Sequence, residues 1–293
     1  MRSLSALLVS ALLLPAAGQT SARIVSTSPS ITETLYALGL GSRVAGVTTY
    51  CNFPPEAKTK PRVGTFLEPD YERILSLKPD LVLVIKNPVQ VTARLRSFGL
   101  KAEDVDMDNV QSVLSATMQI ARLTGRAAEG QRLADSLKRQ LDEVKKAGSK
   151  GGATSVLFLV GRAPGTLQNM VGAGPGTFLD ELLKLAGGRN VLASSPIQYP
   201  KVSLEQIMAT DPDVIIDMGD YAHAENTADS RRREELALWR AHPQLKAVRS
   251  GRIHAVTAAH FVVPGPRMGD AARDFLRFLH PEAVTGAKPP GKQ

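Results

Sequence analysis

The strongest constraint on the fold of this chain is a segment that its sequence contains twice. Residues 71–84 read YERILSLKPDLVLV and residues 204–217 read LEQIMATDPDVIID. Four residue pairs align at a constant offset of 133 positions: Glu72 with Glu205, Ile74 with Ile207, Pro79 with Pro212 and Asp80 with Asp213. Because such an offset indicates an internal structural repeat, we expect two related units in one chain.

Length and composition agree with two packed units. A chain of 293 residues is longer than one hydrophobic core usually serves. A hydrophobic content of 43% and a charged content of 22% are typical of globular proteins. The net charge of +8 is spread along the chain apart from Arg231–Arg233, so a solvated helix face explains this triplet better than nucleic-acid binding does.

The first 22 residues are typical of a secretory signal peptide. One arginine precedes an apolar run of 11 residues from Leu4 to Leu14, and a proline and small residues follow. The run is too short for a membrane span, which needs about 20 residues. Small residues allow cleavage after Gly18 or Ala22. Since no cysteine lies in or directly after this segment, we expect an exported, periplasmic protein without a lipid anchor.

The region from 23 to 125 alternates strands and helices. We expect strands at 23–27, 44–47, 81–85 and 101–105, and helices after Pro29, at 70–77, at 89–98 and at 111–124. Ser30 and Glu33 have the spacing of a capping box in the first helix. The unbroken apolar run LVLVI predicts a strand buried on both faces, as in a parallel sheet covered by helices. This region is therefore predicted to be an α/β lobe.

A single long helix is predicted between two lobes, over residues 126–148. Its apolar stripe is Ala128, Leu133, Leu137, Leu141 and Val144. Such a helix predicts limited movement between the lobes.

The second α/β lobe is expected over 152–283, with strands at 154–160, 214–218 and 252–256 and helices at 177–186, 203–210, 230–240 and 267–279. The GAGPG cluster at 172–176 lacks the Lys-Ser/Thr of a phosphate-binding loop, so a plain turn is the simpler interpretation. The tail 284–293 is expected to be disordered.

Glu72 and Glu205 each fall in the first turn of a short predicted helix. The helix dipole favours a carboxylate there by about 0.3–1 kcal/mol, which is a purely structural explanation. That explanation does not account for the same acid in both lobes. The alternative is that two matching carboxylates dock on a two-fold symmetric partner that carries arginines.

Several motifs together closely resemble the helical-backbone class of ABC-transporter substrate-binding proteins, especially its cobalamin-binding branch. They are the early Ser-Pro-Ser with Thr-Glu, YCNFPPEA, ERILSLKPDLV, GTFLDELLKLAGGRNV, YPKVSLEQI and GPRMGDAARDFL. The resemblance implies two Rossmann-like α/β lobes with mainly parallel sheets, joined by one long helix, with the ligand held between them. It also implies a monomer that delivers its ligand to a two-fold symmetric permease through Glu72 and Glu205.

The resemblance places the ligand contacts at Tyr50, Phe66 and Tyr199, because flat aromatic side chains suit a large macrocycle. Ile85, Ala259 and Val263 depart from the branch's pattern of aromatic or polar contacts. His260 is either an ordinary hydrogen-bonded side chain or an axial ligand to the metal of a corrinoid or haem. Arg267 either caps the last helix or reaches an anionic group of the ligand.

Three functions remain open at this stage. The first is capture of cobalamin or another corrinoid without catalysis, and the second is capture of haem or a ferric siderophore by the same kind of protein. The third is a hydrolase or transferase that uses Cys51 or a serine, although no G-x-S-x-G motif occurs. The lone Cys51 is more simply a structural residue, and the five histidines show no metal-binding spacing. We therefore expect no cofactor and no metal site of the protein's own.

Overall fold

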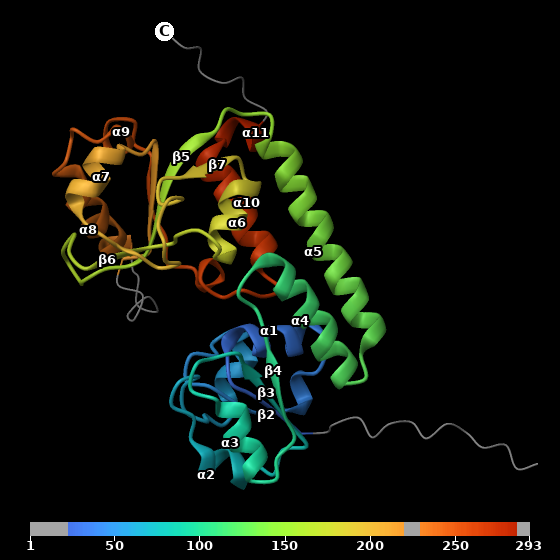
Figure 1. Cartoon of the computed structure of the whole chain (residues 1–293). Coiled ribbons are helices and arrows are strands. Elements are labelled where there is room, and N and C mark those ends of the chain that lie inside the picture. The colour runs from blue at the N-terminus through green and yellow to red at the C-terminus, as the bar shows by residue number, and fades with distance from the viewer. Residues whose placement is uncertain (1–22, 220–228, 286–293) are drawn as a thin grey trace, which may run out of the picture.

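The computed structural model describes residues 23–219 and 229–285, which form two α/β lobes and a long helix that runs beside both (Figure 1). The predicted signal peptide and most of the predicted tail lie outside the described residues. Helix α11 (Pro281–Thr285) extends across residue 283, the predicted boundary between the second lobe and the tail.

The N-terminal lobe contains a parallel sheet with the strand order β2-β1-β3-β4. Its strands are β1 (Ile24–Ser26), β2 (Val44–Val47), β3 (Leu81–Ile85) and β4 (Ala102–Val105). Its helices are α1 (Pro29–Ala37), α2 (Tyr71–Ser76), α3 (Val91–Ser97) and α4 (Val110–Leu123). Each expected strand and helix of this lobe is present, with ends shifted by one or two residues.

Both faces of this sheet are covered, as the LVLVI run predicted. Leu81 and Leu83 of β3 pack in a core with α1 and α4, whereas Val82 and Val84 pack with α2 and α3. Because side chains alternate along a strand, a strand buried on both faces must be apolar at every position.

The predicted capping box of α1 is wrong. Ser28 is the N-cap residue and its hydroxyl accepts a hydrogen bond from the backbone N–H of Ile31, with Pro29 in the first turn. Ser30 lies inside the helix, where its carbonyl accepts from the Thr34 hydroxyl. Glu33 is therefore available for a different contact, described below.

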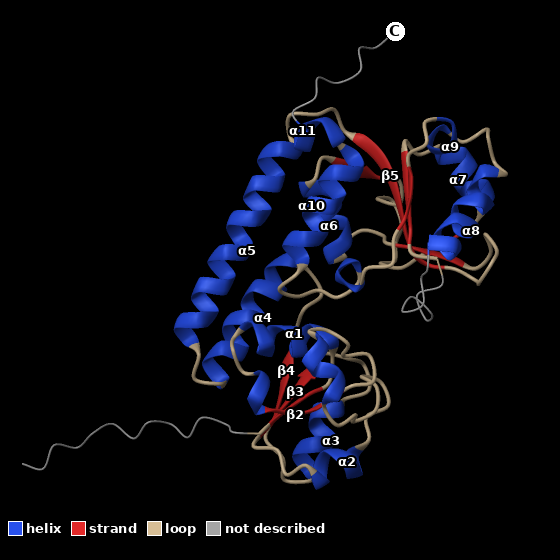
Figure 2. Cartoon of the chain, turned by 180° about the vertical axis from the view of Figure 1, so that it is seen from behind, coloured by secondary structure: helices blue, strands red, loops and turns tan. Residues whose placement is uncertain are grey.

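The connecting helix α5 (Ala127–Gly148) follows the predicted range closely. Its buried face contains Leu137, Leu141 and Val144 of the predicted stripe, together with Ala134. This face packs against α4 and against α10 (Met268–Leu279) of the second lobe. Figure 2 shows α5 along one side of the molecule, with α4 between the lobes.

The C-terminal lobe has a mixed sheet with the order β10-β9-β5-β6-β8, and β7 pairs with β5. Its strands are β5 (Thr154–Gly161), β6 (Met170–Gly172), β7 (Gly188–Asn190), β8 (Lys201–Val202), β9 (Val214–Asp217) and β10 (Ile253–Ala255). Its other helices are α6 (Phe178–Leu185), α7 (Leu204–Thr210), α8 (Asp229–Arg240) and α9 (Lys246–Arg249). The short strands β6, β7 and β8 were not predicted, and β6 pairs in antiparallel fashion with β5 and β8.

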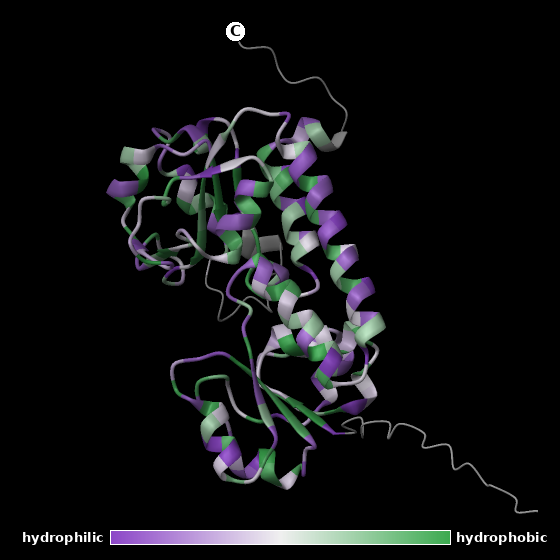
Figure 3. Cartoon of the chain, turned by 45° about the vertical axis from the view of Figure 1, so that its right-hand side comes forward, coloured by the Kyte–Doolittle hydropathy of each residue, from purple (hydrophilic) through white to green (hydrophobic). Residues whose placement is uncertain are grey.

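One hydrophobic core continues through both lobes. It joins Ile31 and Leu35 of α1 to Phe158 of β5 and Phe275 of α10, by way of α4 and α5. In Figure 3 the strands inside each lobe are coloured mostly hydrophobic, whereas hydrophilic and hydrophobic residues alternate along α5. A shared core resists separation of the lobes because separation would expose apolar surface, so the expected limited lobe movement has a physical basis.

The repeated segment forms the same connection in each lobe, a short helix that leads into a strand of the sheet. α2 and α7 begin at N-cap residues Asp70 and Ser203, which are also 133 positions apart. Asp80 accepts a hydrogen bond of 2.8 Å from the backbone N–H of Arg23, just before β1. Asp213 likewise accepts bonds of 3.0 and 2.6 Å from the backbone N–H and hydroxyl of Ser155 in β5. The Pro-Asp of the repeat therefore fixes the start of the central strand.

We expect Asp213→Ala to lower the free energy of unfolding by about 1.5–3 kcal/mol, the range for hydrogen bonds to a charged group. Burial by itself would raise the pKa of Asp213, but the hydrogen bonds from Ser155 together with the charges of Lys246 and Arg252 hold this pKa below its ordinary value of 3.8. Its contribution is therefore complete above that value and is lost as the pH falls below it. Urea denaturation at pH 7 and pH 3 measures both effects. Asp142→Ala, on the exposed face of α5, should change stability little.

Candidate functional site

The segments that follow the carboxyl ends of several strands bring the two lobes into contact. β1 leads into α1, and β4 leads to Asp108, whose carbonyl accepts a hydrogen bond from the backbone N–H of Phe178 in the second lobe. Beside it, the backbone N–H of Val110 donates to Glu181 of α6 at 2.7 Å. Because ligands bind at the carboxyl ends of the strands in open α/β sheets, we expect a ligand site at the lobe junction.

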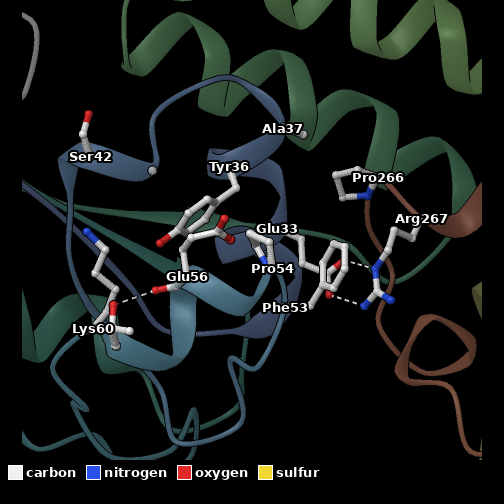
Figure 4. Close-up of a pocket in the computed structure, with 12 residues that line it drawn as sticks. Glu33, Tyr36, Ala37, Ser42, Phe53, Pro54, Glu56, Lys60, Pro266 and Arg267 are labelled. Carbon is white, nitrogen blue, oxygen red and sulfur yellow. Dashed lines mark hydrogen bonds and ion pairs between the residues drawn. The ribbon is translucent and has the colours of Figure 1, made fainter.

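An ion pair between Glu33 and Arg267 joins the lobes at this junction (Figure 4). The guanidinium of Arg267 donates to both carboxylate oxygens of Glu33, with a distance of 2.8 Å from Nε to Oε2. The guanidinium carbon also lies 4.0 Å from the ring centre of Phe53. A bidentate pair with an aromatic face beside it holds the arginine in one position.

The same residues form one end of an open pocket of about 710 Å³. Its walls come from α1, the 3₁₀ turns Gly41–Arg43 and Pro55–Thr59, and the segment before α10. Among the residues predicted to bind ligand, Arg267 lines this pocket, whereas Tyr50, Phe66, Tyr199 and His260 do not. Arg267 is the N-cap residue of α10, but its side chain makes no capping hydrogen bond.

Burial has the largest effect on the pKa of Glu33. Only 3% of its side chain is exposed, and this burial raises the pKa of Glu33 above its ordinary value, although Arg267 and His260 act in the opposite direction. His260 Nε2 lies 2.9 Å from Asp274 Oδ2. His260 therefore has a carboxylate partner, and its predicted role at a ligand's metal stays a prediction.

Tyr50, Phe66 and Tyr199 are exposed large aromatic side chains. Tyr50 follows the carboxyl end of β2, Phe66 lies before α2, and Tyr199 lies before β8. Although 48% of Tyr199 is exposed, the surrounding protein reduces the solvation of its phenol and raises its pKa, and the nearby charge of Asp108 adds to the effect. Tyr199 of the second lobe is therefore close to the segment that links β4 to α4. The predicted ligand contacts of these three residues remain predictions.

The cationic side chains at the carboxyl ends of the central strands have carboxylate partners. Lys86, after β3, lies 2.7 Å from Asp106 and 3.9 Å from Asp108. Arg162, after β5, lies 2.9 Å from Asp217, and both side chains are only 1% exposed. Charged groups so paired present little net charge to a ligand.

The two predicted docking residues, Glu72 and Glu205, occupy equivalent positions in α2 and α7. Both are exposed, and no ion pair of either is found in the part of the chain that the structure describes. Figures 1 and 2 both place α2 and α7 on the side of the molecule away from α5. The pair is therefore presented on the outer surfaces of the two lobes.

Cys51 is fully buried. The hydroxyls of Thr32 and Thr48 lie 3.2 and 3.0 Å from its sulfur. Burial raises the pKa of the Cys51 thiol, which suppresses the reactive thiolate. This environment is that of a structural cysteine rather than of a nucleophile.

Over residues 23–219 and 229–285, no group of three or more His, Cys, Asp or Glu side chains is arranged to hold a metal ion. Nor does any helix in these ranges have the length and apolar character needed to cross a membrane. The GAGPG cluster leads from the end of β6 into a turn, and Thr177, directly after it, is the N-cap residue of α6. Residues Arg231–Arg233 lie within α8.

Sequence reasoning missed the partner of Arg267. The sequence gives Glu33 only the spacing of a capping box and gives Phe53 no evident role, because their common partner is more than 200 residues away. It also missed the buried cluster in which Trp239 Nε1 and Arg162 both donate to Asp217. The signal for Glu33 was present, since a glutamate one turn inside a helix beside apolar residues needs a partner when buried.

These features place the chain among known proteins. It matches the family described as periplasmic binding protein over residues 24–259, and it belongs to that family. Members of this class are substrate-binding proteins, in agreement with the two α/β lobes and the connecting helix described above.

Individual relatives bind different ligands. The vitamin B12-binding protein of Vibrio cholerae serotype O1 is 27% identical over 260 residues, 88% of each chain. That of Yersinia pestis is 29% identical over 229 residues, 78% of this chain and 79% of its own. The crystal structure of the V. cholerae protein BtuF has a TM-score of 0.75 at 26% identity, over 91% of this chain and 99% of its own. The periplasmic heme-binding protein RhuT of Roseiflexus has the same TM-score and identity, over 90% and 99%.

Proposed function

We propose that this protein binds cobalamin or a related corrinoid between its lobes and delivers it to an ABC-type permease in the inner membrane. It acts in the periplasm as a monomer and performs no chemistry on its ligand. Its similarity to the vitamin B12-binding proteins over most of both chains supports this proposal. The similarity to a heme-binding structure means that the choice of ligand must rest on the site itself.

The pairing of Arg267, and of the cations that follow the central strands, is the observation that favours a corrinoid. Arg267, Arg162 and Lys86 each lie against a carboxylate, and Asp108 adds a further negative charge beside Lys86. Haem carries two anionic propionate groups, and such groups form their strongest hydrogen bonds with cations that have no carboxylate partner. A corrin ring instead carries neutral carboxamide groups on its periphery. These groups can hydrogen-bond to polar side chains and to ion-paired side chains, so the site needs no net positive charge.

The exposed aromatic residues favour a large ligand with flat faces. Tyr50 is 56%, Phe66 41% and Tyr199 48% exposed. Two of these come from one lobe and one from the other. A macrocycle that contacts residues of both lobes would bury much of this aromatic surface.

Haem or a ferric siderophore is the second candidate. The structural similarity to RhuT favours it, as does the presence of His260 near the junction. A hydrolase that uses Cys51 is opposed by the burial of the thiol and its raised pKa.

The purified protein should keep the red absorption bands of a corrinoid after incubation with equimolar cyanocobalamin and haemin followed by gel filtration. A retained Soret band without corrinoid bands would contradict corrinoid binding and would indicate haem as the ligand. Retention of neither would contradict both candidates. The same treatment of heat-denatured protein controls for non-specific adsorption of haemin.

A further inference from the structure

Exposed large apolar side chains are concentrated on the N-terminal lobe. Of the nine found among the described residues, seven belong to this lobe and two to the other. They are Tyr50, Phe53, Phe66, Leu67, Leu75, Val89 and Phe98 in the first, and Ile197 and Tyr199 in the second. Single exposed apolar residues are ordinary, but a contiguous group on a soluble protein marks an interaction surface.

One such group surrounds Glu72, and we call it the α2–α3 patch: Tyr71, Leu75 and Phe98. The rings of Tyr71 and Phe98 meet edge to face with centres 5.9 Å apart. The guanidinium carbon of Arg94 in α3 lies 4.7 Å from the ring centre of Tyr71. Leu75 is one helical turn after both Tyr71 and Glu72, so it lies beside each of them. Leu75 and Phe98 are 37% and 43% exposed.

The second lobe repeats only part of this arrangement. Met208 is the counterpart of Leu75 at the offset of 133 and lies one turn after Glu205. Met208 is only partly exposed and packs against the hydrophobic core of its lobe. In addition, Gln244 Nε2 lies 3.8 Å from its sulfur. Among the described residues, the carboxylates are therefore equivalent in the two lobes, whereas α2 carries an exposed large apolar side chain beside its glutamate and α7 does not.

From this asymmetry we infer that the α2–α3 patch is part of the docking surface for the permease and makes the N-terminal lobe the tighter of the two contacts. The inference rests on the proposed function. The occupant is the periplasmic face of the permease, with a cationic side chain for Glu72 and apolar side chains for Leu75 and Phe98. A two-fold symmetric partner offers the same surface to both lobes, so the difference must arise from this protein.

The test compares substitutions in the α2–α3 patch with a substitution at Met208, the counterpart of Leu75 in the second lobe. The importer is the ABC transporter of the source organism whose ATPase activity the cobalamin-loaded protein stimulates, purified in nanodiscs. Its affinity is measured by biolayer interferometry for wild type, for Leu75→Ser with Phe98→Ser, and for Met208→Ser. We expect the double variant to bind about tenfold more weakly, as for loss of a central apolar contact. Met208→Ser should change affinity less than threefold, and cyanocobalamin binding should be unchanged in both.

The outcomes separate this inference from the proposed function. Equal affinity of the wild type and the double variant would overturn the inference, and so would an equal loss in Met208→Ser. Glu72→Ala with Glu205→Ala tests the docking carboxylates independently, because that variant keeps the α2–α3 patch. Failure of the wild type to bind cyanocobalamin would contradict the proposed ligand, whatever the docking result. Retained cyanocobalamin binding also shows that each variant is folded.

Discussion

Replacement of Arg267 by methionine should lower the free energy of unfolding by about 3–5 kcal/mol, because it leaves a buried carboxylate without its partner. Glu33 is almost fully buried and receives two hydrogen bonds from this guanidinium. Methionine keeps much of the apolar contact with Phe53 while removing the charge. Urea denaturation at pH 7 measures the loss.

Two control variants accompany this prediction. One makes the same arginine-to-methionine change at an exposed ion pair, and the other replaces both members of the Glu33–Arg267 pair. Arg277→Met removes an ion pair with Asp274 from a guanidinium that is 58% exposed, so it should cost about 1 kcal/mol or less. Glu33→Gln combined with Arg267→Met removes the unpaired charge and should recover much of the stability lost in Arg267→Met alone. A cost below that of Arg277→Met would show that the ion pair does not hold the lobes together.

Truncation of the aromatic side chains should weaken ligand binding without unfolding the protein. We expect Tyr199→Ala and Tyr50→Ala each to raise the dissociation constant for cyanocobalamin by about ten- to hundredfold, because buried aromatic contacts dominate binding energies. Both side chains are exposed, so their loss leaves no cavity in the core. Fluorescence quenching or calorimetry measures the affinity.

Phe98→Ala is the matched control for this prediction. Phe98 is 43% exposed, close to the 48% of Tyr199, but it lies at the end of α3 against Tyr71. Cyanocobalamin binding should be the same in this variant and in wild type. An equal loss in all three variants would indicate a general effect on folding, and no loss in Tyr199→Ala or Tyr50→Ala would remove these residues from the proposed site.

Much of the fold could be predicted because its signals are local. The LVLVI strand, the apolar stripe of α5 and the Pro-Asp step depend on residues close together in the sequence. The short strands β6 and β8 could not be predicted in the same way. They are three and two residues long, and their pairing is decided by tertiary contacts.

The site was less predictable because its contacts join distant residues. The position of Arg267 in the sequence left open whether it caps a helix or meets a ligand, and the structure shows a third arrangement with Glu33. The pairing of Arg162 with Asp217 depends on strands β5 and β9 lying side by side. The docking role of Glu72 and Glu205 stays a prediction. It rests on the repeat, in which Pro-Asp has a structural role in each lobe whereas the two glutamates are exposed.

Calorimetric titration of the purified protein with cyanocobalamin tests the central claim most directly. It should be run at two temperatures, because burial of apolar surface gives a negative heat-capacity change and the heat cannot vanish at both. The proposal predicts saturable binding of one ligand per protein, weakened in Tyr199→Ala and unchanged in Phe98→Ala. Absence of heat at both temperatures, with saturable binding of haemin in the same buffer, would contradict it.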